Sequence, residues 1–362
     1  MKQNNSMKIL RDHLTLNLAR IKCLSYMISA MLESRQIQIS AMARLFPADV
    51  QTESSFKRIQ RFLKQVTMPA GQVARLLLAI LKINSNEKLT LVFDRTNWKF
   101  GKEHINFLFL CVVYRGISIP LFHKKLSRKK KRGNSSYRDR IALLRVFLKV
   151  FKKKRIACVL GDREFHGMNW IKWLQKERIP YVCRLPENLV NISNENGRFE
   201  KAVHIYQEQK KDTQRYLGLC NIGIANTYES RITTFRANKT KNSMMLLHSP
   251  DIVDPCSKYR ERWQIETTFR ALKRGGFNIE STHVTSPKRL KQLISVLSIA
   301  FCFAYKAGLL IVKAKGIKLK NHGYKLKSFI RYGLDILLEL FRAKDNKCVL
   351  KPPIVLSEIF AI

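Results

Sequence analysis

Three acidic residues stand where their side chains could work together. Asp94 and Asp162 each end a short apolar run of the kind that forms a buried strand, and Glu266 lies in a segment with helical spacing. Taken singly, an aspartate at the end of a strand is more often a turn former or a helix cap. Carboxylates brought close together repel one another unless cations lie between them, and their hard oxygens suit Mg²⁺. If the fold gathers these three acids, they form a site for divalent cations.

The order of the surrounding elements is the feature that would gather them. The pattern predicts an α/β fold in which the first strand carries Asp94 and the fourth carries Asp162. In a ribonuclease-H-like sheet these two strands are neighbours, so the aspartates would meet at one edge while a helix brings the third acid. The predicted elements are strands 89–94, 105–113 and 117–122, helix 137–152, strand 155–162, helix 167–176, strand 181–185, a β-rich insertion at about 186–250 and helix 255–274.

The helix 255–274 is predicted to place four polar side chains on one stripe. Tyr259, Arg262, Glu266 and Lys273 fall within about 60° of one another at 100° per residue. A structural ladder of ion pairs gives the same periodicity and is the default interpretation of the helix alone. That interpretation explains less well why the glutamate should accompany two aspartates at strand ends.

These residues together resemble a known family. The spacing Tyr259-x2-Arg262-x3-Glu266-x6-Lys273 is similar to the signature of bacterial DDE transposases of insertion-sequence family four. Asp94-Arg95-Thr96 and Asp162-Arg163-Glu164-Phe165 resemble the first and second acidic motifs of that family. The resemblance extends over nearly the whole chain. It implies a ribonuclease-H-like catalytic core with a β-rich insertion, for which the 104 positions from Asp162 to Glu266 leave room.

The resemblance also implies a reaction and a role for each residue. Such enzymes bind double-stranded DNA at the ends of an insertion sequence, cleave it and join the 3′ ends to target DNA. Two Mg²⁺ ions, which Mn²⁺ can replace, would be held by the acids, with Asp94 shared and Asp162 and Glu266 holding one ion each. The residues implied to contact phosphates near the cut end are Tyr259, Arg262 and Lys273.

One position departs from the family pattern. Close relatives cut the second strand through a DNA hairpin and stack a flipped base on a tryptophan in the last strand of the insertion. The segment 186–250 contains no tryptophan, and Met244 stands about where that ring would be. A methionine can cover a base but stacks on it less well than an indole, so Met244 is a base-stacking candidate and the hairpin route is a hypothesis.

The charge of the chain points to a polyanionic partner. The 362 residues include 68 Lys and Arg against 26 Asp and Glu, a net charge of +42, while the hydrophobic share of 46% is that of a globular protein. Seven of the nine residues from Lys124 to Arg132 are basic. Such a run is usually a solvated loop, and it supports nucleic acid as the partner without locating a site.

Helical periodicity without strand signals marks residues 1–85 as an all-α domain. Within it, residues 54–63 place Lys57, Arg58 and Arg61 away from an apolar stripe, as on a helix that follows a DNA groove. A solvated surface helix has the same pattern. A catalytic domain at 86–315 and a basic, helical C-terminal region at 316–362 complete the predicted division.

Cysteine and hydropathy patterns indicate in which cellular compartment the protein is expected. The eight cysteines are scattered without Cys-x-x-Cys pairs, as expected of buried thiols, and the N-terminus lacks a signal-peptide core. Residues 293–312 carry a single charge over twenty positions, which is close to the length of a membrane span, but a buried core helix is favoured. We therefore expect a cytoplasmic protein without a membrane partner, and the family resemblance implies that it associates with the bacterial nucleoid.

Two other functions fit the same residues. A ribonuclease-H-like nuclease that cuts without joining would use the same acids, and a basic DNA-binding protein without catalysis, such as a decayed transposase, would keep the charge. Joining two DNA ends at once calls for two active sites, so a homodimer on DNA is expected of the transposase.

Overall fold

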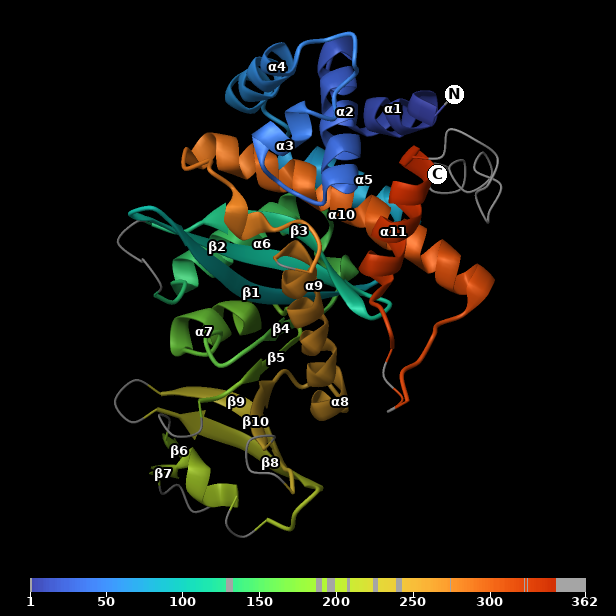
Figure 1. Ribbon diagram of the computed structural model, residues 1–362. Coiled ribbons are helices and arrows are strands. Elements are labelled where there is room, and N and C mark those ends of the chain that lie inside the picture. Colours follow the sequence, from blue (N-terminus) through green and yellow to red (C-terminus); the bar gives the residue numbers. More distant parts are fainter. Residues whose placement is uncertain are drawn as a thin grey trace. The chain divides into compact units, whose positions relative to one another are not determined.

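The chain folds into two compact units. The computed structural model describes residues 2–127, 133–186, 191–193, 199–206, 209–223, 227–238, 243–273, 275–321, 323 and 325–342. One unit, here called the helical unit, comprises Met1–Ser85, Asn97–Ile105 and Thr268–Ile362. The other, here called the sheet unit, comprises Asn86–Thr96 and Asn106–Thr267. Figure 1 labels their helices and strands.

The sheet unit follows the predicted order of elements. Each predicted strand and helix from residue 89 to residue 185 is present, and five further strands form the predicted β-rich insertion. The elements are β1 (Leu89–Phe100), β2 (Glu103–Tyr114), β3 (Ile117–Lys125), α6 (Tyr137–Val150), β4 (Ile156–Gly161), α7 (Met168–Lys176), β5 (Tyr181–Arg184), β6 (Asn191–Ser193), β7 (Phe199–Lys201), β8 (Thr213–Ile222), β9 (Tyr228–Arg236) and β10 (Met244–His248), followed by α8 (Pro255–Arg260) and α9 (Gln264–Leu272).

The strands described form one sheet in the order β3-β2-β1-β4-β5-β10-β9-β8-β6-β7. Strand β1 pairs with β4 and β4 with β5, both in parallel. The insertion joins the same sheet because β10 pairs antiparallel with β5. The predicted α/β class is confirmed, and the order of the first five strands is consistent with a ribonuclease-H-like sheet.

Burial explains why the central strands lack an alternating pattern. The first five residues of β1 are all buried, and in β4 every residue but Ala157 is buried. Parallel strands covered on both faces are expected to be apolar, so an acid after such a run stands out in the sequence. The predicted strand 89–94 ends too early, because β1 continues to Phe100 and Asp94 lies within it.

The predicted helix 255–274 is two helices joined by a tight turn. Asp254 caps α8 by accepting the backbone N–H of Ser257 at 3.0 Å, and Glu261–Trp263 form a 3₁₀ turn before α9 begins. This corrects the prediction of one regular helix. Because a 3₁₀ turn has three residues per turn, the 100° spacing that put four side chains on one stripe does not hold across it.

The chain leaves α9 at Gly275 and Gly276. A Cβ on Gly276 would lie 2.4 Å from the carbonyl oxygen of Ala271, so the chain can pass there only without a side chain.

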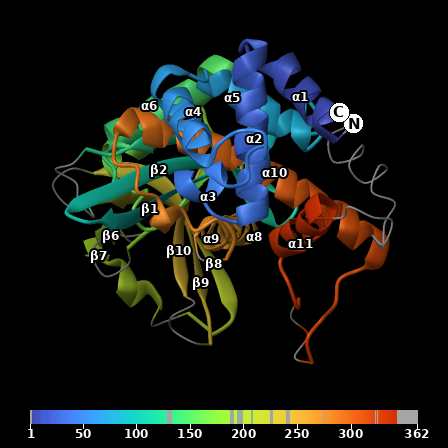
Figure 2. The same ribbon diagram turned by 45° about the horizontal axis from the view of Figure 1, so that its top comes forward.

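The helical unit packs the two ends of the chain together. Its α10 contacts α2, α4, α5 and α11, and Figure 2 shows α2 and α4 lying over α10. The predicted domain boundaries at 85 and 315 stay a prediction. In the structure, the contacts of α10 and α11 join these C-terminal helices to the N-terminal ones. The helices are α1 (Lys2–His13), α2 (Leu18–Ser34), α3 (Ile39–Ala43), α4 (Thr52–Gln65), α5 (Ala70–Ile80), α10 (Pro287–Lys315) and α11 (Phe329–Arg342).

Helix α10 is long and apolar enough to cross a membrane by length and composition. It has 29 residues, and its most apolar 18-residue window is 89% buried inside the protein. Its Gln292 side chain accepts the backbone N–H of Met68 at 3.1 Å, so a polar group on the helix is satisfied within the unit. These features favour the predicted core helix.

Parts of three other predictions concern residues that the structure does not describe. Seven cysteines are buried thiols outside any disulfide, as expected, whereas Cys348 lies outside the described residues. The same is true of residues 128–132 of the basic run and of residues 343–362 of the C-terminal region.

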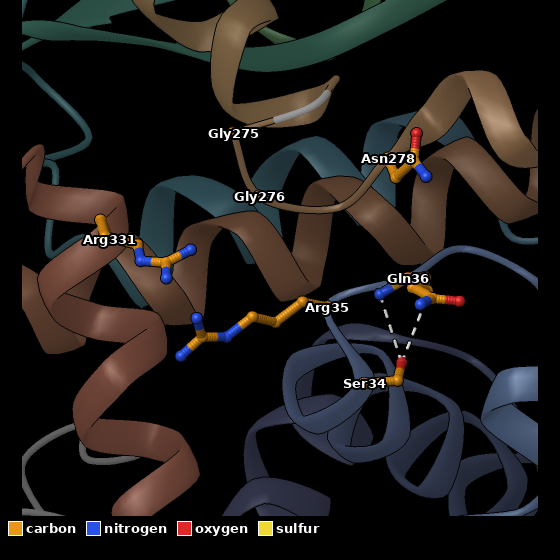
Figure 3. Close-up of a pocket in the computed structure, with 7 residues that line it drawn as sticks. All are labelled: Ser34, Arg35, Gln36, Gly275, Gly276, Asn278 and Arg331. Carbon is orange, nitrogen blue, oxygen red and sulfur yellow. Dashed lines mark hydrogen bonds between the residues drawn. The ribbon is translucent and has the colours of Figure 1, made fainter.

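A carboxylate in the helical unit gathers three cations. Asp335 accepts hydrogen bonds from Arg35 at 2.7 Å and Lys327 at 2.8 Å, and its Oδ1 lies 3.4 Å from Nε of Arg331. Arg35 and Arg331 also line a pocket of about 400 Å³ beside Gly275 and Gly276 (Figure 3). Burial raises the pKa of Asp335, but the hydrogen bonds from Lys327 and Arg35 hold it below its ordinary value.

We expect Asp335→Asn to lower the free energy of unfolding by about 1–2 kcal/mol at pH 7, because three cations lose their shared anion. A lowered pKa in the folded state means that this contribution is present above the ordinary pKa of an aspartate, about 3.9, and is lost as the pH falls through the folded value. Urea unfolding at pH 7 and pH 3 tests this, with Glu339→Gln on the exposed side of α11 as the control. A difference between variant and wild type that does not shrink at all as the pH falls below about 3.9 would contradict the ion-pair explanation.

Candidate functional site

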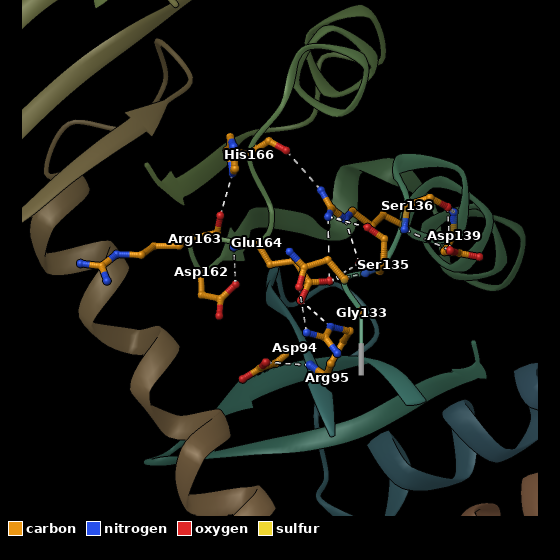
Figure 4. Close-up of polar contacts among 12 residues, drawn as sticks. Asp94, Arg95, Gly133, Ser135, Ser136, Asp139, Asp162, Arg163, Glu164 and His166 are labelled. Atoms are coloured by element: carbon orange, nitrogen blue, oxygen red, sulfur yellow. Dashed lines mark hydrogen bonds and ion pairs between the residues drawn. The ribbon is translucent and has the colours of Figure 1, made fainter. Parts of the chain in front are cut away.

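Strand register brings the first two predicted acids together. In the parallel pair β1 and β4, Val92 lies opposite Leu160, and each aspartate follows two residues later on its own chain segment. The two aspartates therefore lie near each other just past the last register pair, and the charge of Asp162 acts on Asp94. Figure 4 shows both side chains extending from these neighbouring segments toward a common space.

Backbone amides orient both carboxylates. The N–H of Arg95 donates to Oδ1 of Asp94 at 2.7 Å, and the N–H of Glu164 donates to Oδ1 of Asp162 at 2.9 Å. Each aspartate thus has one oxygen fixed by the chain that follows it. These bonds stabilise the ionised carboxylates in defined orientations.

Arg262 links Asp94 to the third acid. Its Nη1 lies 3.6 Å from Oδ2 of Asp94, and its Nη2 lies 3.3 Å from Oε1 of Glu266. The guanidinium also lies over the ring of Tyr259, 5.8 Å from its centroid. The side chains of Arg262 and Asp94 are only 11% and 15% exposed, whereas Glu266 is 40% exposed. Tyr259, Arg262 and Glu266 therefore lie together beside Asp94.

The site holds more negative than positive charge. Burial raises the pKa of Asp94 to about 7, with the charges of Asp162 and Glu266 adding to the rise, while the Arg95 amide and Arg262 oppose it. Burial also raises the pKa of Asp162. The Nη1 atom of Arg262 is buried and makes no hydrogen bond to any described residue. One guanidinium therefore serves as the close counter-charge of two carboxylates, with a third acid adjacent.

The donor set suits a hard divalent cation, which would stabilise the buried carboxylates and relieve the repulsion that adds to the raised pKa of Asp94. Among the described residues, no group of three or more His, Cys, Asp or Glu side chains is arranged to hold one ion. Any metal held by these acids in this arrangement would therefore be coordinated by them in pairs.

Without divalent cations, we expect Asp94→Asn to raise the free energy of unfolding by about 1–2 kcal/mol at pH 8, because it removes a buried charge from an acidic cluster. The pKa of Asp94 is raised from 3.8 to about 7 in the folded protein, so ionisation of Asp94 destabilises the fold fully above pH 7. The gain should shrink toward pH 4, where the wild-type carboxyl is protonated. Urea unfolding in EDTA at both pH values measures it.

The matched control is Asp139→Asn, which removes a carboxylate that caps α6 and pairs with Lys124 at 3.0 Å. That variant should be less stable than the wild type at pH 8. An Asp94→Asn protein that is also less stable at pH 8 would show that the acids are not in net repulsion.

The remaining predicted residues lie elsewhere. Lys273 follows α9 in the helical unit and pairs with Glu280 at 3.0 Å. Met244 is the first residue of β10, half-buried and opposite Phe235 of β9. Neither residue has a described contact with the acids.

The predicted DNA contacts of residues 54–63 lie on α4. Lys57 and Arg61 are exposed there, in agreement with the predicted polar face. Arg58 is half-buried, and its guanidinium lies 5.7 Å from the centroid of the Tyr26 ring. A packed arginine is less available to a DNA phosphate than its two neighbours.

Sequence reasoning did not single out two residues near the acids. Trp263, on the turn directly after Arg262, is 65% exposed, and a large exposed ring in a basic motif is the signal that could have marked it. Lys258 donates to Thr90 on β1 at 2.9 Å and so fastens α8 to the strand that carries Asp94. No sequence signal identifies that contact, since the two residues are far apart in the chain.

Comparison with known proteins identifies a family. A family model described as "Transposase DDE domain" matches residues 86–303, which is more than half of the chain and includes all three acids. No curated protein matches.

Proposed function

The chain belongs to the family of transposases with a DDE domain, and on that premise we propose that it binds the ends of an insertion sequence, cleaves them and joins the 3′ ends to target DNA. The observation that carries the proposal is the parallel pairing of β1 with β4, which brings Asp94 near Asp162, with Arg262 between Asp94 and Glu266. The motifs around these residues favour the cut-and-paste type of insertion-sequence family four, with a ribonuclease-H-like core.

The three acids are proposed to hold two Mg²⁺ ions, which Mn²⁺ can replace. Asp94 and Asp162 would share one ion, and Asp94 and Glu266 the other, in keeping with an oxygen-only donor set. When bound, the ions supply activation of the attacking oxygen and stabilisation of the leaving oxygen of the phosphodiester.

The neighbouring side chains are proposed to bind the DNA strand at the cut. Arg262 presents a planar guanidinium that can grip a phosphate with two hydrogen bonds once its carboxylate partners engage other cations. Burial raises the pKa of Tyr259 to about 12, so its hydroxyl stays protonated and can donate to a phosphate oxygen. Lys273 is proposed as a third phosphate contact.

A gel assay with labelled end DNA, target plasmid and Mg²⁺ tests this function. Cleavage at the end followed by joining of the 3′ strand to the plasmid is the expected result. Cleavage without joining would instead identify a ribonuclease-H-like nuclease, and binding without cleavage a non-catalytic DNA-binding protein. Hairpin-capped DNA ends in the same gel would support Met244 as the base-stacking residue, and direct double-strand breaks would count against it.

Two further proposals concern the oligomeric state of the active protein and its location in the cell. The active species is a homodimer on double-stranded DNA, which light scattering of the complex with two end duplexes tests. The protein acts in the cytoplasm at the bacterial nucleoid, which imaging of a fluorescent fusion tests.

Lys57 and Arg61 are expected to contribute sequence-independent phosphate contacts. Changing both to alanine should lower DNA affinity and reduce the slope of log affinity against log salt by about 2, because each lost contact releases fewer counterions. Fluorescence anisotropy across a salt series measures the slope. Ser54→Ala, at an exposed uncharged position of α4, is the control and should leave the slope unchanged. An unchanged slope in the double variant would mean that α4 is only a solvated helix.

A further inference from the structure

The residues that follow the two aspartates are ion-paired with each other. Arg95 directly follows Asp94, Glu164 comes two residues after Asp162, and Nε of Arg95 donates to Oε2 of Glu164. These are the residues whose backbone N–H groups hold Oδ1 of Asp94 and Oδ1 of Asp162. One ion pair therefore connects the two chain segments that orient the aspartates.

Glu164 is enclosed by donors. Its side chain is 8% exposed, and its Oε1 accepts the N–H of Ser135 at 2.6 Å and the Ser135 hydroxyl at 2.5 Å. Nη2 of Arg140 lies 3.9 Å from the same oxygen and donates to the carbonyl of Ser135 at 2.8 Å. The guanidinium of Arg140 also lies over the ring of Phe165, 4.8 Å from its centroid. The carboxylate of Glu164 is thus fixed from several directions.

Arg95 is held by amides on its other side. Its Nη2 donates to Asn134 at 3.0 Å and its Nη1 to Asn106 of β2 at 3.4 Å, while Asn106 donates to the carbonyl of Gly133 at 3.1 Å. Figure 4 shows Arg95, Glu164 and Ser135 beside the two aspartates. The Arg95–Glu164 pair, here called the clamp, joins the middle of β1, the segment 133–135 and the turn after β4.

Stability alone gives little reason for these charges, because a buried ion pair can often be replaced by apolar residues without loss. Holding two carboxylates at a set separation gives a specific reason. We propose that Glu164, acting through Arg95, is a positioning residue that sets the separation and orientation of Asp94 and Asp162 for the divalent ion they share. This inference rests on the proposed function, since it takes that pair of acids as metal ligands.

Glu164→Gln is expected to raise the Mg²⁺ concentration that half-saturates cleavage by about 10–100-fold, the usual effect of losing a residue that orients metal ligands. The rate at saturating Mg²⁺ should fall much less. A second readout needs neither DNA nor activity, namely the Mg²⁺ concentration that half-saturates the thermal stabilisation of the protein. It should shift by the same factor.

Two companion variants separate positioning from folding. Because Glu164→Gln leaves Arg95 and Arg140 without their anion, the double variant Arg95→Gln/Glu164→Gln removes both charges of the clamp and should fold while showing the same shift. Asp139→Asn removes a carboxylate of the same unit that contacts neither aspartate in the described structure, and it should lose stability without a shift in the Mg²⁺ midpoint.

The inference is overturned if the Mg²⁺ midpoint of both clamp variants stays within about twofold of the wild type, or if Asp139→Asn shifts it equally. It is also overturned if Mg²⁺ does not stabilise the wild-type protein. A wild-type protein that Mg²⁺ stabilises but that neither cuts nor joins DNA would refute the proposed function, and the melting titration would still decide the role of the clamp.

Discussion

Asp94→Asn is expected to lower Mg²⁺-dependent cleavage of end DNA by at least about 10³-fold while leaving DNA affinity within about twofold of the wild type. Asp94 is the acid on which the charges of both others act, and Arg262 lies between it and Glu266. An amide cannot replace a carboxylate that two cations share. Binding relies on basic residues that the change does not touch. Gel analysis of cleavage and anisotropy of end binding measure the two quantities.

The controls for this experiment are in the same unit. Asp162→Asn and Glu266→Gln should lose cleavage in the same way, whereas Glu229→Gln, at an exposed position of β9, should keep it. An Asp94→Asn protein that cleaves at the wild-type rate would remove Asp94 from the site, and the assignment of the other two acids would lose its geometric basis.

The positions of Asp94 and Asp162 were predictable because the strands before them are unusual. A strand segment buried on both faces is a continuous apolar run, and an acid directly after that run is a local signal that needs no knowledge of the fold. The order of strands and helices then predicted which two strands are neighbours, and the parallel pairing of β1 with β4 confirms it. Local pattern and chain order were sufficient for this part of the molecule.

Contacts between distant residues were not predictable. The Arg95–Glu164 pair joins residues 69 positions apart, and the sequence around either residue does not indicate which residue it pairs with. The 3₁₀ turn at Glu261–Trp263 was missed for a different reason. A single 3₁₀ turn is wound more tightly than an α-helix and changes the hydrogen-bond pattern. It is too short to change the apolar periodicity by which helices are recognised.

The grouping of α10 and α11 with the N-terminal helices also depends on packing that the sequence does not display. At their crossing, a Cβ on Gly308 would lie 1.9 Å from the carbonyl oxygen of Phe329, and one on Gly333 would lie 1.7 Å from that of Ala304. The two backbones are therefore in direct contact, and only glycine permits this distance.

Gly308→Val is accordingly expected to lower the free energy of unfolding by about 4 kcal/mol or more, since the two helices must separate and their buried contacts must open. Urea unfolding followed by circular dichroism measures the loss. Ala314→Val, at the exposed end of the same helix, is the control and should cost only a few tenths of a kcal/mol.

The same comparison tests the interpretation of α10 as a core helix. A lone membrane span has no neighbouring backbone at Gly308, so valine there would cost no more than valine at position 314. In a core helix the two substitutions differ by several kcal/mol, because one meets a carbonyl oxygen of Phe329 and the other meets water. Equal effects would contradict both the close crossing and the burial of α10, and a large difference is the result that the packing of α10 against α11 requires.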